Sequence, residues 1–127
     1  GVPVKCVGDG FLCFFSGADH ANRAIKAALY SKKVIYQKDL VIALHTGDIY
    51  LGLIGHPNYA VRDIVGETVN RPFLMLGWIS KHIPSGIGVT DSTISETTDC
   101  FSYIHHENVT IDLMDKIIDV YEIKGTK

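Results

Sequence analysis

The chain has 127 residues, of which 46% are hydrophobic, and it carries 12 Lys and Arg against 14 Asp and Glu. This length is sufficient for one compact domain with its own core. A net charge of −2 without a basic run argues against a nucleic-acid binder, and no apolar stretch approaches the ~20 residues of a membrane span. Three cysteines without a CxxC pair indicate reduced thiols, which predicts a cytoplasmic protein.

The first 34 residues are predicted to form a hairpin followed by a helix. Residues 2–7 and 11–15 flank Gly8-Asp9-Gly10, and the Asp-Gly pair is typical of a tight hairpin turn. The strand at 11–15 is apolar on both faces, which predicts a position in the interior of a sheet. From Ala18 to about Val34, apolar residues recur at three- and four-residue steps, which predicts an amphipathic helix.

The middle of the chain is predicted to hold a second hairpin and a second helix. Residues 40–44 and 49–55 are rich in β-forming residues on either side of a turn at His45–Asp48, and a short strand at 59–65 follows. The second helix begins at Gly66-Glu67-Thr68. Its expected buried residues are Val69, Phe73, Leu76 and Ile79.

The last third is predicted to supply most of the remaining strands. A strand at 87–89 leads into a helical turn at 90–96 that begins with Thr90-Asp91-Ser92. The expected closing strands are 101–105, 108–113 and 117–123. This order predicts a single α+β domain over 1–127, with a mainly antiparallel sheet and helices packed on it.

Three local strings carry the candidate chemistry. They read K-C-V-G-D-G at 5–10, L-H-T-G-D-I-Y-L-G-L-I-G at 44–55 and D-I-V-G-E-T-V-N at 63–70. In this order they resemble the catalytic domain of the class III nucleotidyl cyclases, the adenylate and guanylate cyclase family. That family reads K-x-x-G-D, I-H-x-G-x-V-x-x-G-x-x-G and D-x-x-G-x-x-V-N-x-x-x-R. The resemblance covers nearly the whole chain and implies a ferredoxin-like, palm-type fold without the family's first strand and helices.

The resemblance implies roles for four residues. Asp9 matches the second metal-binding aspartate, for Mg²⁺ or Mn²⁺. Lys5 and Asp63 match the residues that read the purine, a pairing that favours ATP over GTP. Asn70 matches the asparagine that contacts the ribose and orients the substrate. Simpler roles stay open: a turn residue for Asp9, a solvated Lys5, an ion pair between Asp63 and Arg62, and helix capping for Asn70.

The sequence also departs from the family at its active-site positions. Leu74 stands where the family has the arginine that stabilises transition-state charge. Arg71 is expected to point elsewhere, because it comes three residues earlier on the helix, and does not take this role. Only Lys116 is a candidate for the phosphate-binding lysine near the last strand. The family's first metal aspartate, in a D-x-x-G-[FY]-[ST] string, has no counterpart in the sequence.

Two functions therefore compete. The first is an adenylate-type cyclase that converts ATP to cyclic AMP and pyrophosphate, as a homodimer or as a heterodimer with another cyclase domain. The second is a degenerate module that dimerises or binds nucleotide for regulation. A diguanylate cyclase is disfavoured because no G-G-[DE]-E-F string occurs. His45, His56 and the His105-His106 pair lack the ligand spacing of a zinc site.

Overall fold

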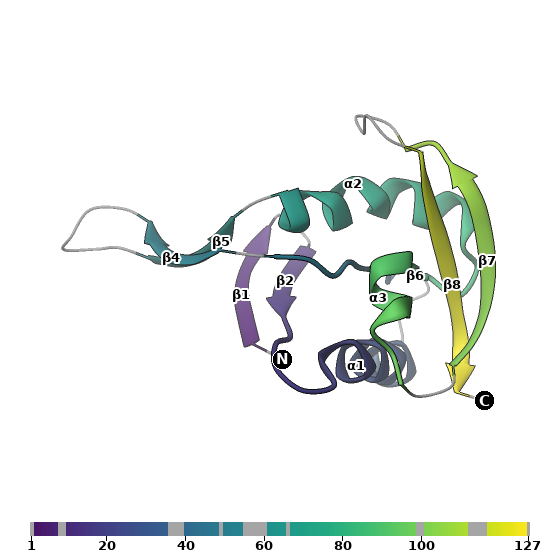
Figure 1. Cartoon of the computed structure of the whole chain (residues 1–127), viewed down its shortest axis with the longest axis horizontal. Coiled ribbons are helices and arrows are strands. Elements are labelled where there is room, and N and C mark those ends of the chain that lie inside the picture. Colours follow the sequence, from purple (N-terminus) through teal and green to yellow (C-terminus); the bar gives the residue numbers. More distant parts are fainter. Residues whose placement is uncertain are drawn as a thin grey trace.

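The structure of the chain is a computed structural model, which describes residues 2–7, 10–35, 40–48, 50–54, 61–65, 67–98, 101–111 and 117–126. Its elements, in chain order, are β1 (Val2–Val7), β2 (Gly10–Phe14), α1 (His20–Val34), β3 (Ile42–Leu44), β4 (Tyr50–Ile54), β5 (Val61–Val65), α2 (Glu67–His82), β6 (Ile87–Thr90), α3 (Asp91–Ser95), β7 (Phe101–Val109) and β8 (Ile118–Thr126) (Figure 1). None of the helices described has the length and apolar character needed to cross a membrane.

A four-stranded sheet forms the centre of the fold. Its strand order is β3-β6-β8-β7, in which β8 is antiparallel to both of its neighbours and β3 is parallel to β6. Two further antiparallel pairs, β1 with β2 and β4 with β5, form two-stranded sheets. The prediction of an α+β fold with a mainly antiparallel sheet is confirmed.

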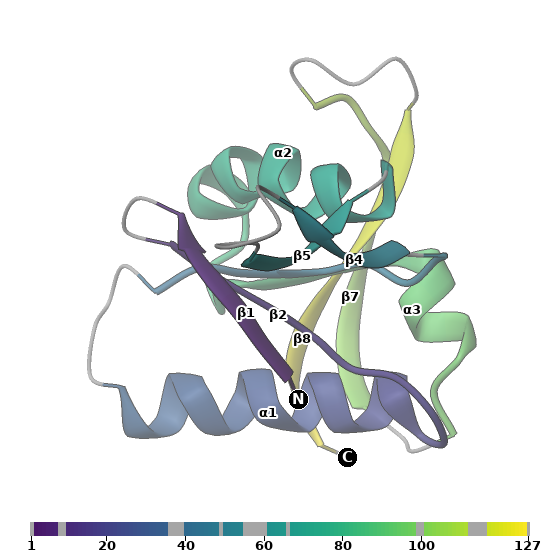
Figure 2. The ribbon, with the colours of Figure 1, turned by 90° about the vertical axis from the view of Figure 1, so that its left-hand side faces the viewer.

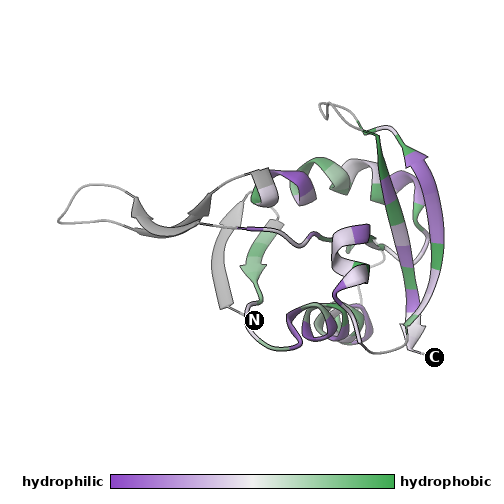
Figure 3. Ribbon diagram, in the orientation of Figure 1, coloured by the Kyte–Doolittle hydropathy of each residue, from purple (hydrophilic) through white to green (hydrophobic). Residues whose placement is uncertain are grey.

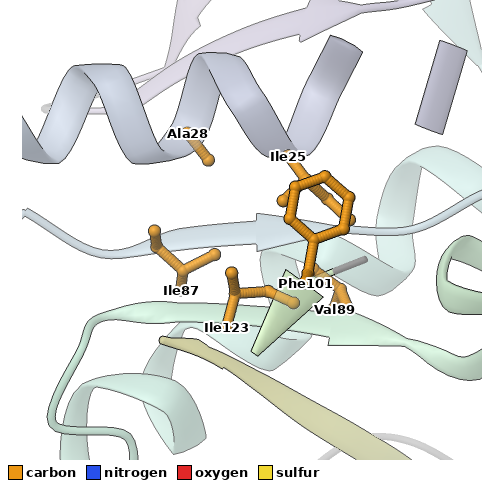
Figure 4. Packing of buried hydrophobic residues seen from close by; sticks show 6 residues of the cluster. All are labelled: Ile25, Ala28, Ile87, Val89, Phe101 and Ile123. Carbon is orange, nitrogen blue, oxygen red and sulfur yellow. The ribbon is translucent and has the colours of Figure 1, made fainter. Parts of the chain in front are cut away.

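The two long helices cover opposite faces of the four-stranded sheet (Figure 1). Because successive side chains of a strand point to opposite faces, β8 presents Ile123 to the α1 side and Val120 to the α2 side. The buried residues on the α1 side are Ile25, Ala28, Ile87, Val89, Phe101 and Ile123 (Figure 4). Those on the α2 side are Met75, Ile79, Ile83, Val109, Ile111 and Val120.

Helix α2 packs closely on β6 because β6 carries a glycine there. A Cβ atom at Gly88 would lie 2.7 Å from Cδ1 and 2.8 Å from Cγ1 of Ile79. Ile79 itself is completely buried. The predicted buried face of this helix is confirmed at Val69 and Ile79, whereas Phe73 and Leu76 are only partly buried.

The predicted second hairpin does not form. Strand β3 pairs with β6, and β4 pairs with β5, so Ile42–Leu44 and Tyr50–Ile54 belong to different sheets. The physical reason is that the partly buried residues 41–44 pack on both faces of this segment. Ile42 and Leu44 pack on the α1 side, whereas Val41 and Ala43 pack on the α2 side.

The strand at 11–15 was predicted to lie inside a sheet, and this prediction is wrong. Among the strands described, β2 pairs only with β1. The side chain of Phe11 is 63% exposed, and Cys13 is also exposed. An apolar pattern predicts a strand, but its burial depends on neighbours that the pattern does not identify.

Strand β7 is one continuous strand where two shorter ones were expected. The pairing with β8 shifts register between His106 and Val109, and Asn108 has a φ of 54°. This local irregularity explains why the sequence pattern suggested a break. The middle of β7 is hydrophilic while β8 alternates, which suits an edge strand beside a central one (Figure 3).

Asp119 links β8 to this irregular part of β7. Its Oδ1 accepts a 3.0 Å hydrogen bond from the Asn108 backbone N–H, and its Oδ2 lies 3.0 Å from Nε2 of His105. The Asn108 hydrogen bond, followed by that of His105, lowers the pKa of Asp119 below its ordinary value of 3.8. The ionised carboxylate is therefore favoured by folding.

The substitution Asp119→Asn should remove a pH-dependent part of the stability. A carboxyl group with a lowered pKa stabilises the folded state above its unfolded pKa, and this contribution is lost as the pH falls through the folded pKa. Urea unfolding of both proteins between pH 6 and pH 2 checks this. The wild type should be the more stable above about pH 4, and the difference should shrink as the pH falls through the folded pKa of Asp119. A difference that stays constant over this range would contradict the assignment.

Candidate functional site

The structure places three of the four predicted site residues on described elements. Lys5 lies in β1 opposite Leu12, and Asp63 lies in β5 opposite Gly52. Asn70 lies in the first turn of α2 and is exposed. The fourth, Asp9, is outside the described residues, as is Lys116.

The fold brings the strands of Lys5 and Asp63 together. Strand β1 contacts β5, although more than fifty residues separate these two positions in the sequence. Strand β5 ends at Val65 and α2 begins at Glu67, so Asn70 follows Asp63 within one short strand-to-helix connection. The strand that carries Lys5 therefore contacts the strand that leads into the start of α2.

The second motif string reaches the same end of α2 through Gly47. A Cβ atom at Gly47 would lie 2.6 Å from Oγ1 and 3.2 Å from Cγ2 of Thr68. A larger residue would thus force the Thr68 side chain or one of the two segments to move. This close approach explains the glycine in the string, and Thr68 is a contact that the sequence analysis did not identify.

A hydroxyl-rich network holds the same segment to α3. Nδ1 of His45 lies 2.8 Å from Oγ1 of Thr90 and 3.3 Å from Oγ of Ser92. Ser92 Oγ donates a 2.9 Å hydrogen bond to the backbone oxygen of Thr46. Thr46 Oγ1 in turn lies 2.9 Å from Oγ1 of Thr93. His45 therefore supports the fold at this point.

The T-D-S-T sequence at 90–93 was interpreted as a helix start, and this is confirmed. Thr90 is the N-cap residue of α3. Its side chain, however, makes no capping hydrogen bond and instead faces His45 and Ser92. The serine and threonine residues that favour a helix start thus also anchor the segment that leads from β3 to the site.

Comparison with known proteins gives a clear result at the level of structure. Neither a family model nor a curated protein matches the sequence. The guanylyl cyclase Cya2 has a TM-score of 0.83 at 18% identity, covering 100% of this chain and 71% of its own. The guanylate cyclase domain of RhGC from Catenaria anguillulae, in complex with GTP, has a TM-score of 0.78 at 19% identity. The match covers 99% of this chain and 73% of the RhGC chain. The adenylyl cyclase CyaB from P. aeruginosa has a TM-score of 0.71 at 19% identity. The match covers 100% of this chain and 73% of the CyaB chain.

The chain has the fold of a nucleotidyl cyclase catalytic domain. The matches cover essentially all of its length, so the fold implied by the three motif strings is confirmed. Guanylyl and adenylyl cyclases both occur among these structures, and the fold does not distinguish between their nucleotides.

Within the cyclase fold, position 74 is occupied by an apolar side chain. Leu74 is partly buried and packs against the cluster that contains Met75 and Ile79. It lies one helical turn after Asn70, on the same side of α2. The position that the resemblance aligns with the family's arginine therefore packs against the hydrophobic cluster on the α2 side. Arg71 lies at a different angle around the helix.

The predicted metal ligand, Asp9, lies outside the residues that the structure describes. Within the described ranges, no group of three or more His, Cys, Asp or Glu residues could hold a metal ion. His105 is instead paired with Asp119, and Nε2 of His106 lies 3.8 Å from the buried carboxylate of Glu122. The carboxylate of Asp9 has the oxygen chemistry that Mg²⁺ and Mn²⁺ require, and its role stays a prediction.

Proposed function

We propose that this domain catalyses the cyclisation of a nucleoside triphosphate, with ATP as the favoured substrate and cyclic AMP and pyrophosphate as products. The observation that carries this proposal is a cyclase fold in which the strand of Lys5 contacts that of Asp63 and Gly47 lies against Thr68 in the first turn of α2. The 127 residues would act as one catalytic-type domain in the cytoplasm.

The proposed reaction requires the ribose 3′-oxygen to attack the α-phosphorus and pyrophosphate to leave. Asp9 would hold a Mg²⁺ or Mn²⁺ ion, whose charge offsets that of the triphosphate and favours deprotonation of the attacking hydroxyl. Lys5 would donate a hydrogen bond to the purine edge, and Asp63 would accept one. Asn70, exposed at the start of α2, would contact the ribose and align the 3′-oxygen.

We infer that the active form is a dimer with sites between two subunits. In this arrangement Lys5, Asp63 and Asn70 of one subunit would face Asp9 of the other. A homodimer would carry Leu74 at both sites, whereas a heterodimer could receive the missing arginine from its partner domain.

The position of Leu74 favours a second candidate function. Because position 74 is a leucine, partly buried against the α2-side cluster, no guanidinium stabilises phosphate charge from this position. A module with this site could bind nucleotide or dimerise for regulation without turnover. Binding of a fluorescent ATP analogue without product formation would favour this function.

An assay of cyclic nucleotide formation from ATP and from GTP, with Mg²⁺ and with Mn²⁺, tests the proposal. The protein should be assayed alone and mixed with a second cyclase domain. We expect product from ATP above background, and a preference for GTP would contradict the assignment of Lys5 and Asp63. Absence of product from both nucleotides under both conditions would retire the catalytic proposal.

The variant Asn70→Ala should lower kcat by about 10²-fold, since a misaligned attacking group costs a factor of this size. Ser80→Ala is the matched control because Ser80 is also exposed on α2, near its other end. It should leave the rate unchanged. Equal rates for both variants, with folding intact by circular dichroism, would mean that Asn70 does not contact the substrate.

A further inference from the structure

Helix α1 presents a basic and partly apolar surface to solvent. Arg23, Lys26, Tyr30, Lys33 and Val34 are all exposed and recur at steps of three and four residues, so they share one side of the helix. We call this set the outer face of α1. Tyr30 is 65% exposed and Val34 is 53% exposed, so the outer face combines cations with apolar side chains.

The charge of α1 is strongly asymmetric with respect to the rest of the chain. The helix, HANRAIKAALYSKKV, holds four Lys or Arg residues and no Asp or Glu. The whole chain, by contrast, has 14 Asp and Glu against 12 Lys and Arg. An acidic protein thus exposes one helix of uniformly positive sign.

The cations on α1 are divided between two roles. Nζ of Lys32 turns inward and donates a 2.6 Å hydrogen bond to the backbone oxygen of Leu40. Arg23 donates to the backbone oxygens of Ala18 and Ser16, yet its side chain stays exposed. Since these acceptors are neutral, its positive charge is retained. The outer face therefore carries the charges of Arg23 and Lys33, with the exposed Lys26 between them.

The outer face lies at an edge of the molecule. Figure 1 and Figure 2 both show α1 along one side of the fold, with the sheet on its inner side. From residue 23 to residue 34 the helix extends about 16 Å, and its cations are distributed along this length. Ile35, immediately after the helix, adds a further exposed apolar side chain.

We propose that the outer face of α1 binds the anionic surface of a phospholipid membrane. Dispersed cations beside an exposed tyrosine and aliphatic side chains match a fluid layer of acidic headgroups with an apolar boundary beneath. An acidic protein would instead need carboxylates at matching fixed positions, and this convex helix offers no groove to orient them. The inference goes beyond the proposed nucleotide chemistry and does not depend on it.

Co-sedimentation with lipid vesicles tests this proposal. The probes are vesicles of phosphatidylcholine alone and of phosphatidylcholine with 30% phosphatidylserine, at 25 mM and 500 mM salt. We expect binding to the anionic vesicles at low salt, little binding to the neutral ones, and loss of binding at high salt because the charges are then screened.

Lys33→Gln and Lys81→Gln form a matched pair of variants. Both lysines are exposed in the last turn of a long helix, but α1 and α2 lie on opposite faces of the sheet. Each basic residue near an anionic surface strengthens binding roughly fivefold, so Lys33→Gln should weaken partitioning by about this factor. Lys81→Gln should have little effect.

Several outcomes would overturn the proposal. Equal losses for Lys33→Gln and Lys81→Gln would show that net charge, and not the outer face, sets the affinity. Equal binding to neutral and anionic vesicles would exclude an electrostatic mode. Binding to polyglutamate that Lys33→Gln weakens, together with no binding to anionic vesicles, would assign the face to an acidic protein partner. Thermal unfolding of each variant separates these results from a loss of folding.

Discussion

Replacing Leu74 with arginine is expected to raise the rate of cyclic nucleotide formation by about 10²-fold. Position 74 lies one helical turn after Asn70, so a guanidinium there would extend along the same side of α2 towards the substrate. Leu74 is only partly buried. The aliphatic stem of arginine can therefore keep part of the contact with the core while its charged group reaches solvent.

Ser80→Arg is the control for this substitution. It adds the same charge to the same helix, but at an exposed position near the opposite end from the motif strings. Its rate should equal that of the wild type in the same assay. If Leu74→Arg folds normally and leaves the rate unchanged, position 74 does not face the triphosphate, and the alignment with the family's arginine is wrong.

Gly88→Ala is expected to lower the free energy of unfolding by about 2 kcal/mol. The added methyl group would lie 2.7 Å from Cδ1 and 2.8 Å from Cγ1 of Ile79, and 3.3 Å from Cγ1 of Val120. Ile79 and Val120 are completely buried, so neither can move away without disturbing its other neighbours. The helix α2 would have to shift away from β6. Chemical denaturation measures the loss.

A double-mutant cycle with Ile79→Ala identifies the cause of this loss. Ile79→Ala alone should cost about 2–5 kcal/mol because it leaves a cavity. In that background the methyl group of Gly88→Ala enters the cavity, so its cost should fall close to zero. Gly125→Ala is the control, since no atom lies within 4 Å of a Cβ there. An equal cost for Gly88→Ala in both backgrounds would contradict close packing as the explanation.

The helices and most strands could be predicted because the spacing of apolar residues within each segment indicates its secondary structure. The apolar spacing predicted the helix from 18 to 34, and the observed helix spans His20–Val34. The strand partners could not be predicted in the same way. Strand β3 pairs with β6, more than forty residues later, and only the packing of both of its faces selects that partner.

The candidate site could be proposed from the sequence as a set of ordered motifs, whereas the contacts between the motifs could not be predicted. Lys5, Asp63 and Asn70 stand out because three strings occur in a fixed order along the chain. The contact of Gly47 with Thr68 depends on a close approach between two segments, which a glycine permits but does not reveal in sequence. The exposure of Tyr30 and Val34 on α1 likewise depends on which elements the chain leaves outside the core.

The position of β8 in the sheet also has a consequence for biosynthesis. It lies between β6 and β7 and hydrogen-bonds to both, yet it follows both of them in the sequence. While a ribosome is still making β8, β7 has no partner and β6 has only β3. Helices α1 and α2 then have an incomplete surface to pack on. The domain therefore gains its cooperative stability late in translation, and until then its apolar strands need protection from aggregation.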